Sequence, residues 1–156
     1  AIMVLKTGQT APSFKLYDQS GTLHRLEDYR GQRVLLYFYP KDDTLGCTTE
    51  ACSFRDDYSA YRDEDVVILG VSPDSVESHT NFSEKYQLPF PLLSDPDHRV
   101  CEQYGVWGKK TMFGKEFQGV FRTTYVIDSE GIIAHVFENV KPEGHSAEVL
   151  EALSPS

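Results

Sequence analysis

The sequence is poor in cysteine, has no long hydrophobic run and carries no excess of positive charge. Three cysteines in 156 residues are too few, and odd in number, for the disulfide scaffold of a small secreted protein. No apolar stretch approaches the roughly 20 residues that a membrane-spanning helix needs. A net charge of −9 disfavours nucleic acid and anionic membrane surfaces as partners. We therefore expect no nucleic-acid or membrane partner, and cysteines that are either buried or reactive.

The length and composition fit one folded domain. A chain of 156 residues can form one full hydrophobic core and is short for two. No repeat, low-complexity tract or linker divides it, so we predict a single domain over residues 1–156. No basic segment followed by an apolar core stands near its beginning, so we expect no secretory signal. The cysteine usage favours a reducing compartment: the cytoplasm, or the plastid stroma if a transit peptide has been removed.

Strand and helix signals alternate along the chain. Continuous apolar runs predict buried strands at residues 34–39, 66–71 and 124–128, and residues 132–137 return as a hairpin partner of the third. Apolar residues three and four apart predict helices at residues 47–61, 76–86 and 146–153. We expect small strands between Val4 and Leu26, and loop with a short helix from Asp95 to Gly119. The alternation predicts an α/β fold with a central sheet.

One segment concentrates the candidate functional residues. Pro40, Thr44 and Cys47 lie between a predicted strand and the start of a predicted helix, and Cys52 follows five residues after Cys47. A cysteine at a helix N-terminus can exist as a thiolate at neutral pH, because backbone N–H groups and the helix dipole stabilise the anion. Since the thiolate is the nucleophilic form, this segment is the best candidate for a catalytic site.

Cys47 and Cys52 cannot form a disulfide on an intact helix. Positions five apart are separated by about 7.5 Å of rise and about 140° of rotation, whereas a disulfide needs Cα atoms within about 7 Å of each other. A bond between them would require the segment from Thr48 to Phe54 to unwind. The alternative interpretation is that Cys52 is a small core residue.

Other polar and sulfur-containing residues have structural interpretations. Cys101, in an apolar and aromatic setting, is expected to be a buried thiol, with a backup thiol as the alternative. A zinc site needs about four ligands, and His79, His98 and Cys101 are scattered, so we predict no metal and give no histidine a role. Asp42 and Asp43 are interpreted as a solvated pair on a loop.

The order of elements, with a cysteine at the start of the first long helix, resembles the thioredoxin fold. The run Pro40-x-x-x-Thr44-x-x-Cys47 is similar to the active-site motif of peroxiredoxins. The position of Cys52 resembles the peroxiredoxin Q, or bacterioferritin comigratory protein, branch of that family. The likeness extends over nearly the whole chain, through residues 8–14, 31–34, 92–95 and 101–108. One departure is Leu45, where the branch often has proline; it is expected to loosen the loop but removes no catalytic group.

The resemblance implies an α/β, thioredoxin-like fold with a central mixed sheet flanked by helices and an N-terminal β extension. It implies a thiol-dependent peroxidase that reduces hydrogen peroxide and organic hydroperoxides without a cofactor. Cys47 would be the peroxidatic cysteine and form a sulfenic acid. Cys52 would resolve it as an intramolecular Cys47–Cys52 disulfide, which thioredoxin or a related thiol reductant would reopen. A monomer is the expectation for this branch.

The resemblance also implies how the groups around the cysteine act. The Thr44 hydroxyl would donate to the thiolate or accept from the peroxide. The backbone N–H groups of Gly46 and Cys47 would point into the same pocket, and Pro40 would shield the sulfur from water.

A cation is needed beside the thiolate, and the sequence offers several. Arg122 is selected because it lies directly before an apolar strand, which would place it at a strand end close to the first helix. It also matches the essential arginine of the family. Glu50 would hold this arginine by a charge-assisted hydrogen bond, or would be an acid favoured by the helix dipole.

Two other functions remain open on the same fold. A thiol–disulfide oxidoreductase is disfavoured because the chain lacks Cys-x-x-Cys and has no proline before the predicted strand at Thr124. A non-enzymatic redox sensor or chaperone would use the unwinding helix as a switch. It would be oxidised rapidly without turnover by any reductant.

Overall fold

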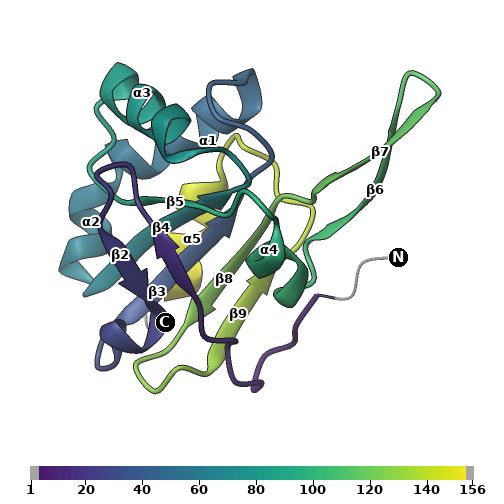
Figure 1. Ribbon diagram of the computed structural model, residues 1–156. Helices are drawn as coiled ribbons and strands as arrows, with labels where there is room; N and C mark the ends of the chain where they lie inside the picture. The colour runs from purple at the N-terminus through teal and green to yellow at the C-terminus, as the bar shows by residue number, and fades with distance from the viewer. Residues whose placement is uncertain (1–3, 154–156) are drawn as a thin grey trace.

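The computed structural model describes residues 4–153, which form a seven-stranded mixed sheet, a separate two-stranded hairpin and helices on both faces of the sheet (Figure 1). The strands are β1 (Lys15–Tyr17), β2 (Leu23–Arg25), β3 (Arg33–Phe38), β4 (Val66–Ser72), β5 (Leu92–Ser94), β6 (Trp107–Met112), β7 (Lys115–Val120), β8 (Thr123–Ile127) and β9 (Ile133–Phe137). The helices are α1 (Leu45–Asp56), α2 (Tyr58–Asp63), α3 (Val76–Tyr86), α4 (Arg99–Gln103), α5 (His145–Leu153) and the 3₁₀ helix η1 (Leu26–Tyr29).

The sheet order is β2-β1-β5-β4-β3-β8-β9. The central strands β3, β4 and β5 are parallel, while β8 runs antiparallel to β3 and β9 antiparallel to β8. The short strand β1 joins the sheet through β5, so the N-terminal segment extends the same sheet. This arrangement confirms the expected mixed sheet with an N-terminal β extension.

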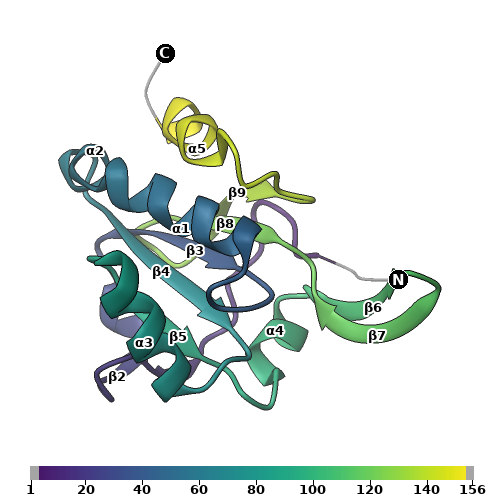
Figure 2. The same ribbon diagram turned by 90° about the horizontal axis from the view of Figure 1, so that it is seen from above.

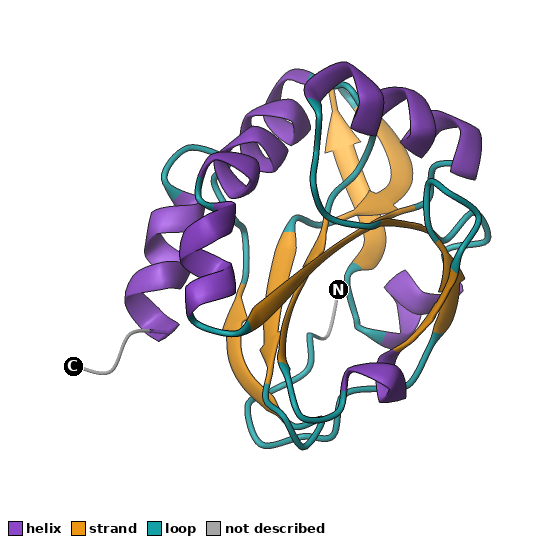
Figure 3. Cartoon of the chain, turned by 90° about the vertical axis from the view of Figure 1, so that its left-hand side faces the viewer, coloured by secondary structure: helices purple, strands orange, loops and turns teal. Residues whose placement is uncertain are grey.

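Alternate residues of β3 supply the two halves of the core, as the period of two in a strand requires. Leu35 and Tyr37 face a cluster that also contains residues of α1, α2, α3 and α5. Leu36 and Phe38 face a second cluster formed with α4 and the N-terminal segment. Figure 3 shows the longer helices gathered along one side of the strands. A strand covered on both faces is apolar throughout, which explains the continuous run in its sequence.

The predicted strands correspond to β3, β4, β8 and β9, and the β8–β9 pair is the expected hairpin. The helix predicted at residues 76–86 is α3, whose N-cap Ser75 accepts a hydrogen bond from the backbone N–H of Ser78. The predicted helix from Cys47 to Tyr61 is wrong in one respect, because it is divided at Asp57 into α1 and α2. No helix within residues 4–153 has the length and apolar character needed to cross a bilayer.

The segment from Asp95 to Gly119 differs most from its prediction. It contains the expected short helix, α4, but also β6 and most of β7, which pair only with each other. Figure 2 shows this hairpin projecting away from the body of the protein. Residues 111–118 are all exposed, so the two strands bury no alternating apolar face there. The usual sequence signal of a half-buried strand is therefore missing.

Candidate active site

Cys47 lies in the first turn of α1, directly after the loop that leaves β3. The first helical hydrogen bond runs from the Thr48 N–H to the Thr44 carbonyl at 2.8 Å. The amides of the preceding residues, Gly46 and Cys47 among them, belong to the helix end that has no carbonyl four residues back. The Cys47 side chain is buried, with 1 % of the residue exposed. A thiolate at this position would meet the positive end of the helix dipole.

Arg122 reaches the same place from the other end of the sequence. It precedes β8, and the β3–β8 register pairs Phe38 with Thr123, so the start of β8 lies beside the end of β3. Its Nη2 lies 3.4 Å from the Cys47 sulfur, and its Nη1 donates to Glu50 Oε1 at 2.8 Å. The expected placement of this arginine, at a strand end beside the first helix, agrees with the structure.

Glu50 lies one turn after Cys47 and is almost fully buried. Burial raises the pKa of its carboxyl to about 7, although the Arg122 guanidinium acts in the opposite direction. Burial alone would lower the pKa of Arg122, but Glu50 and Cys47 raise it. Within residues 4–153, the second carboxyl oxygen of Glu50 has no hydrogen-bond partner. The glutamate therefore fixes one edge of the guanidinium and leaves the other directed at the sulfur.

The loop before α1 brings the remaining predicted residues to the site. Pro40 is half-buried, and Thr44 is the exposed N-cap of α1. The Thr44 hydroxyl donates to the Lys41 carbonyl at 2.9 Å. At Gly46, an added Cβ would lie 3.1 Å from Nη2 of Arg122, so the absence of a side chain allows the guanidinium to approach the helix.

Cys52 and Cys101 are free thiols in different environments. Cys52 is half-buried in the middle of the continuous helix α1, and burial raises the pKa of its thiol. Cys101 is completely buried, and burial, with a further contribution from Asp95, raises its pKa well above the ordinary value. The structure agrees with the interpretation of Cys101 as a buried thiol.

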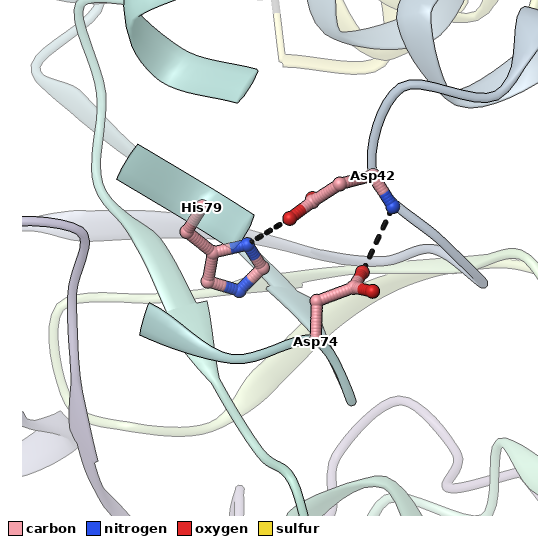
Figure 4. Close-up of side chains that lie close together, drawn as sticks. All are labelled: Asp42, Asp74 and His79. Atoms are coloured by element: carbon pink, nitrogen blue, oxygen red, sulfur yellow. Dashed lines mark hydrogen bonds and ion pairs between the residues drawn. The ribbon is translucent and has the colours of Figure 1, made fainter. Parts of the chain in front are cut away.

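The interpretation of Asp42 as a solvated loop residue is wrong. Its carboxylate is buried, accepts a hydrogen bond from the Tyr39 hydroxyl at 2.6 Å and lies 2.6 Å from Nδ1 of His79 (Figure 4). Its neighbour Asp43 is exposed, as expected, and bonds Lys85 at the surface. One sequence feature could have indicated this contact. His79 lies on the apolar face of its predicted helix, and a buried histidine needs a polar partner.

Comparison with known proteins gives a consistent result. Residues 7–136 match the model of the AhpC/TSA family. The chain is 53 % identical to a putative peroxiredoxin bcp of Coxiella burnetii, over 97 % of this chain and 100 % of that protein. It is 48 % identical to peroxiredoxin Bcp of Bacillus subtilis, over 97 % of this chain and 96 % of that protein.

Solved structures agree in fold. Peroxiredoxin Q of Xanthomonas campestris superposes with a TM-score of 0.86 at 40 % identity, covering 90 % of this chain and 89 % of that one. A mutant peroxiredoxin Q of Xylella fastidiosa superposes with a TM-score of 0.92 at 35 % identity, covering 97 % and 96 %. The chain belongs to the AhpC/TSA family, and within it to the peroxiredoxin Q, or Bcp, branch of the peroxiredoxins.

Proposed function

We propose that Cys47 is the peroxidatic cysteine of this peroxiredoxin, that Cys52 resolves its sulfenic acid, and that thioredoxin or a related dithiol reduces the resulting disulfide. The observation that carries the proposal is the contact between the Arg122 guanidinium and the Cys47 sulfur in the first turn of α1. A cation and free helix amides around one buried sulfur are the surroundings in which a thiolate is stable.

The Cys47 thiolate attacks the terminal oxygen of a hydroperoxide. An S–O bond forms, the O–O bond breaks, and two electrons pass from sulfur to the peroxide. The products are a sulfenic acid and, after the leaving oxygen takes up a proton, water or an alcohol. Arg122 lies where negative charge moves from the sulfur to the leaving oxygen, and fixed donors at such a point lower the barrier.

The other groups of the site align the peroxide. The Gly46 and Cys47 amides face the developing negative charge, and Pro40 limits access of water to the sulfur. Thr44 contributes its hydroxyl to the peroxide or the thiolate. Because that hydroxyl donates to the Lys41 carbonyl before substrate binds, its free lone pairs are available to accept from the hydroperoxide O–H. Glu50 holds the guanidinium in this arrangement.

Resolution requires a change in α1. The Cys52 sulfur attacks the sulfenic sulfur, a disulfide forms and water leaves. Both cysteines lie in one continuous helix, where their separation excludes this bond. The segment from Thr48 to Phe54 must therefore unwind, and a dithiol reductant then reopens the disulfide by thiol exchange.

Organic hydroperoxides are proposed as substrates beside hydrogen peroxide. One related solved structure was studied for the alkyl peroxide reduction activity of the Xanthomonas campestris bacterioferritin comigratory protein. We further propose that the chain acts as one domain and as a monomer in the cytoplasm, without nucleic-acid or membrane partners. The relatives described above are bacterial, which gives the plastid alternative no support.

Peptide mass spectrometry under non-reducing conditions, after one equivalent of hydrogen peroxide, tests the proposal. We expect a Cys47–Cys52 disulfide, with the buried Cys101 unmodified as an internal control. Sulfenic or sulfinic acid on Cys47 with Cys52 free would show that Cys52 does not resolve. An unmodified Cys47 would remove the peroxidatic assignment itself.

A further inference from the structure

A buried hydrogen-bond cluster connects the loop before α1 to two neighbouring elements. Asp42 lies on the loop between Pro40 and Thr44, and its carboxylate contacts Nδ1 of His79 on α3 at 2.6 Å (Figure 4). His79 is 0 % exposed, and its Nε2 lies 2.9 Å from the carbonyl oxygen of Leu93 on β5. One aspartate–histidine contact thus links the loop, α3 and β5.

The protons of this cluster can be assigned from its acceptors. A backbone carbonyl only accepts hydrogen bonds, so Nε2 of His79 carries a proton and donates to Leu93. A second proton lies between Nδ1 of His79 and Oδ2 of Asp42. The Asp42 carboxylate also accepts from the hydroxyls of Tyr39 at 2.6 Å and Ser78 at 2.8 Å. Both carboxylate oxygens of Asp42 therefore have partners.

We call the cluster of Tyr39, Asp42, Ser78 and His79 the brace, because its hydrogen bonds link the loop to α3. Its arrangement does not suit a metal ion. Ligand atoms of Asp42, Asp74 and His79 lie within 4.8 Å of one another, a spacing that one cation could bridge. Yet Asp74 Oδ2 already accepts from the Asp42 N–H at 2.8 Å and from the Ser72 hydroxyl at 2.6 Å. A cation would have to displace these donors and the proton between Asp42 and His79. The free energy lost with these hydrogen bonds would offset much of the free energy gained by coordination.

The brace holds the part of the site that must stay in place while another part moves. Asp42 is two residues from both Pro40 and Thr44. Its side chain contacts His79 on α3, and its backbone N–H donates to Asp74 in the segment between β4 and α3. Cys52 lies on the later turns of α1, outside these contacts. The loop that precedes α1 is thus held by contacts that the later turns of α1 do not share.

We propose that Asp42 and His79 are positioning residues for the peroxidatic cysteine, which hold the loop from Pro40 to Thr44 and the first turn of α1 against α3 and β5. The proposal rests on the assignment of Cys47 as the peroxidatic cysteine. Neither residue touches the peroxide. They act by keeping the Thr44 hydroxyl and the first-turn amides aligned on it, since small displacements of aligned groups reduce rates strongly.

The test compares three variants of the reduced full-length protein: Asp42→Ala, Asp42→Asn and the control Asp43→Asn. Asp43 is the adjacent loop residue with the same charge, and it makes only exposed contacts with Lys85 and Tyr86, which contribute little. Its φ is +57°, a left-handed conformation that asparagine tolerates. We measure the second-order rate of Cys47 oxidation by hydrogen peroxide in single turnover, and the rate of Cys47 alkylation by iodoacetamide.

Alkylation requires a thiolate but no alignment of a peroxide. We expect Asp42→Ala to lower peroxide oxidation more than tenfold while alkylation is no slower than in the unmodified protein. Asp43→Asn should stay within a factor of about two in both rates. Asp42→Asn should recover most of the oxidation rate, because its amide can accept from Tyr39 and donate to a neutral His79 Nδ1. Equal oxidation rates for Asp42→Ala and Asp43→Asn, or no recovery in Asp42→Asn, would overturn the proposal.

A second substitution covers the case in which Asp42→Ala does not fold. Tyr39→Phe removes one hydrogen bond to Asp42 and keeps the buried ring, so we expect a fewfold lower oxidation rate with unchanged alkylation. An unchanged oxidation rate in this variant would count against the brace. If the unmodified protein itself shows no oxidation of Cys47, the failure belongs to the proposed function and not to the positioning pair.

Discussion

The Arg122 guanidinium lies 3.4 Å from the Cys47 sulfur, although 75 residues separate them in the sequence. The antiparallel register of β3 and β8 brings them together, because it sets the start of β8 beside the end of β3. The contact joins the loop–helix junction at the start of α1 to the start of β8. The Cys47 sulfur therefore meets a cation whose position is determined by the sheet.

Replacing Arg122 by lysine keeps the positive charge but cannot contact Glu50 and Cys47 with two nitrogens of one planar group. Losing one charge-assisted hydrogen bond costs about 1.5–3 kcal/mol, so we expect Cys47 oxidation to slow by roughly 10- to 150-fold. Stopped-flow oxidation of the reduced protein measures the effect. The exposed Arg99, which pairs with Asp97 at the surface, provides the control Arg99→Lys. A rate within twofold of the unmodified protein would contradict the role of Arg122.

The free energy of unfolding should depend on pH through the titration of Glu50. Burial raises the pKa of its carboxyl from 4.5 to about 7 in the folded protein, so the folded state binds this proton more tightly than the unfolded state. The stability that this group contributes is present below about pH 4.5 and is lost as the pH rises to about 7. Glutamine does not titrate. The free energy of unfolding of Glu50→Gln should therefore increase relative to the unmodified protein between about pH 5 and 8.

Denaturant unfolding of both reduced proteins at several pH values measures this difference. The two proteins have all other titrating groups in common, so the difference between their free energies of unfolding reports the titration of Glu50. Parallel curves over this range would show that burial does not raise the pKa of Glu50.

Proline in place of Leu45 should stabilise the protein. Leu45 is the first residue of α1 and is 88 % exposed, and proline fits this position because its fixed φ suits the first helical turn. The preceding Thr44 has φ −92° and ψ 159°, an extended conformation that proline requires of its neighbour. We expect a gain of about 0.4–1 kcal/mol through reduced freedom of the unfolded chain, or about 1–4 °C in Tm.

Leu45→Ala is the matched control, since it removes the same exposed side chain without restricting the backbone. Calorimetry on the reduced proteins separates the two. The expected gain is absent if Leu45→Pro unfolds at the same temperature as Leu45→Ala.

Oxidation should loosen one defined part of the chain. If the disulfide joins Cys47 and Cys52, amides between Thr48 and Phe54 should exchange with deuterium faster in the oxidised protein, because their helical hydrogen bonds are broken. Amides of the central strand β3 should be unchanged. Cys52→Ser treated with peroxide is the control and should keep the slow exchange of the reduced protein. Equal exchange in the reduced and oxidised protein would show that the disulfide forms without unwinding.

The sequence by itself predicted the elements whose residues are patterned by burial. The run from Val34 to Tyr39 is apolar because β3 is covered on both faces, and the apolar face of α3 repeats with the helical period. The five-residue separation of Cys47 and Cys52 followed from helix geometry alone. The β6–β7 hairpin was missed because exposed strands that pair only with each other leave no such pattern.

The contacts of Arg122 with Cys47 and Glu50 were expected from the resemblance, but only the tertiary structure decided that Asp42 meets His79. The residues of the local motif, Pro40, Thr44 and Cys47, were recognisable because they lie close in the sequence. The contact of Asp42 with His79 crosses 37 residues and depends on how α3 packs beside the loop. The pattern of apolar residues in a sequence indicates which side chains are buried. Which partner a buried polar group finds depends on sheet register and helix packing. The sequence therefore predicted the chemistry proposed for Cys47 and several of its neighbours, and the fold added the buried Asp42–His79 contact behind the loop.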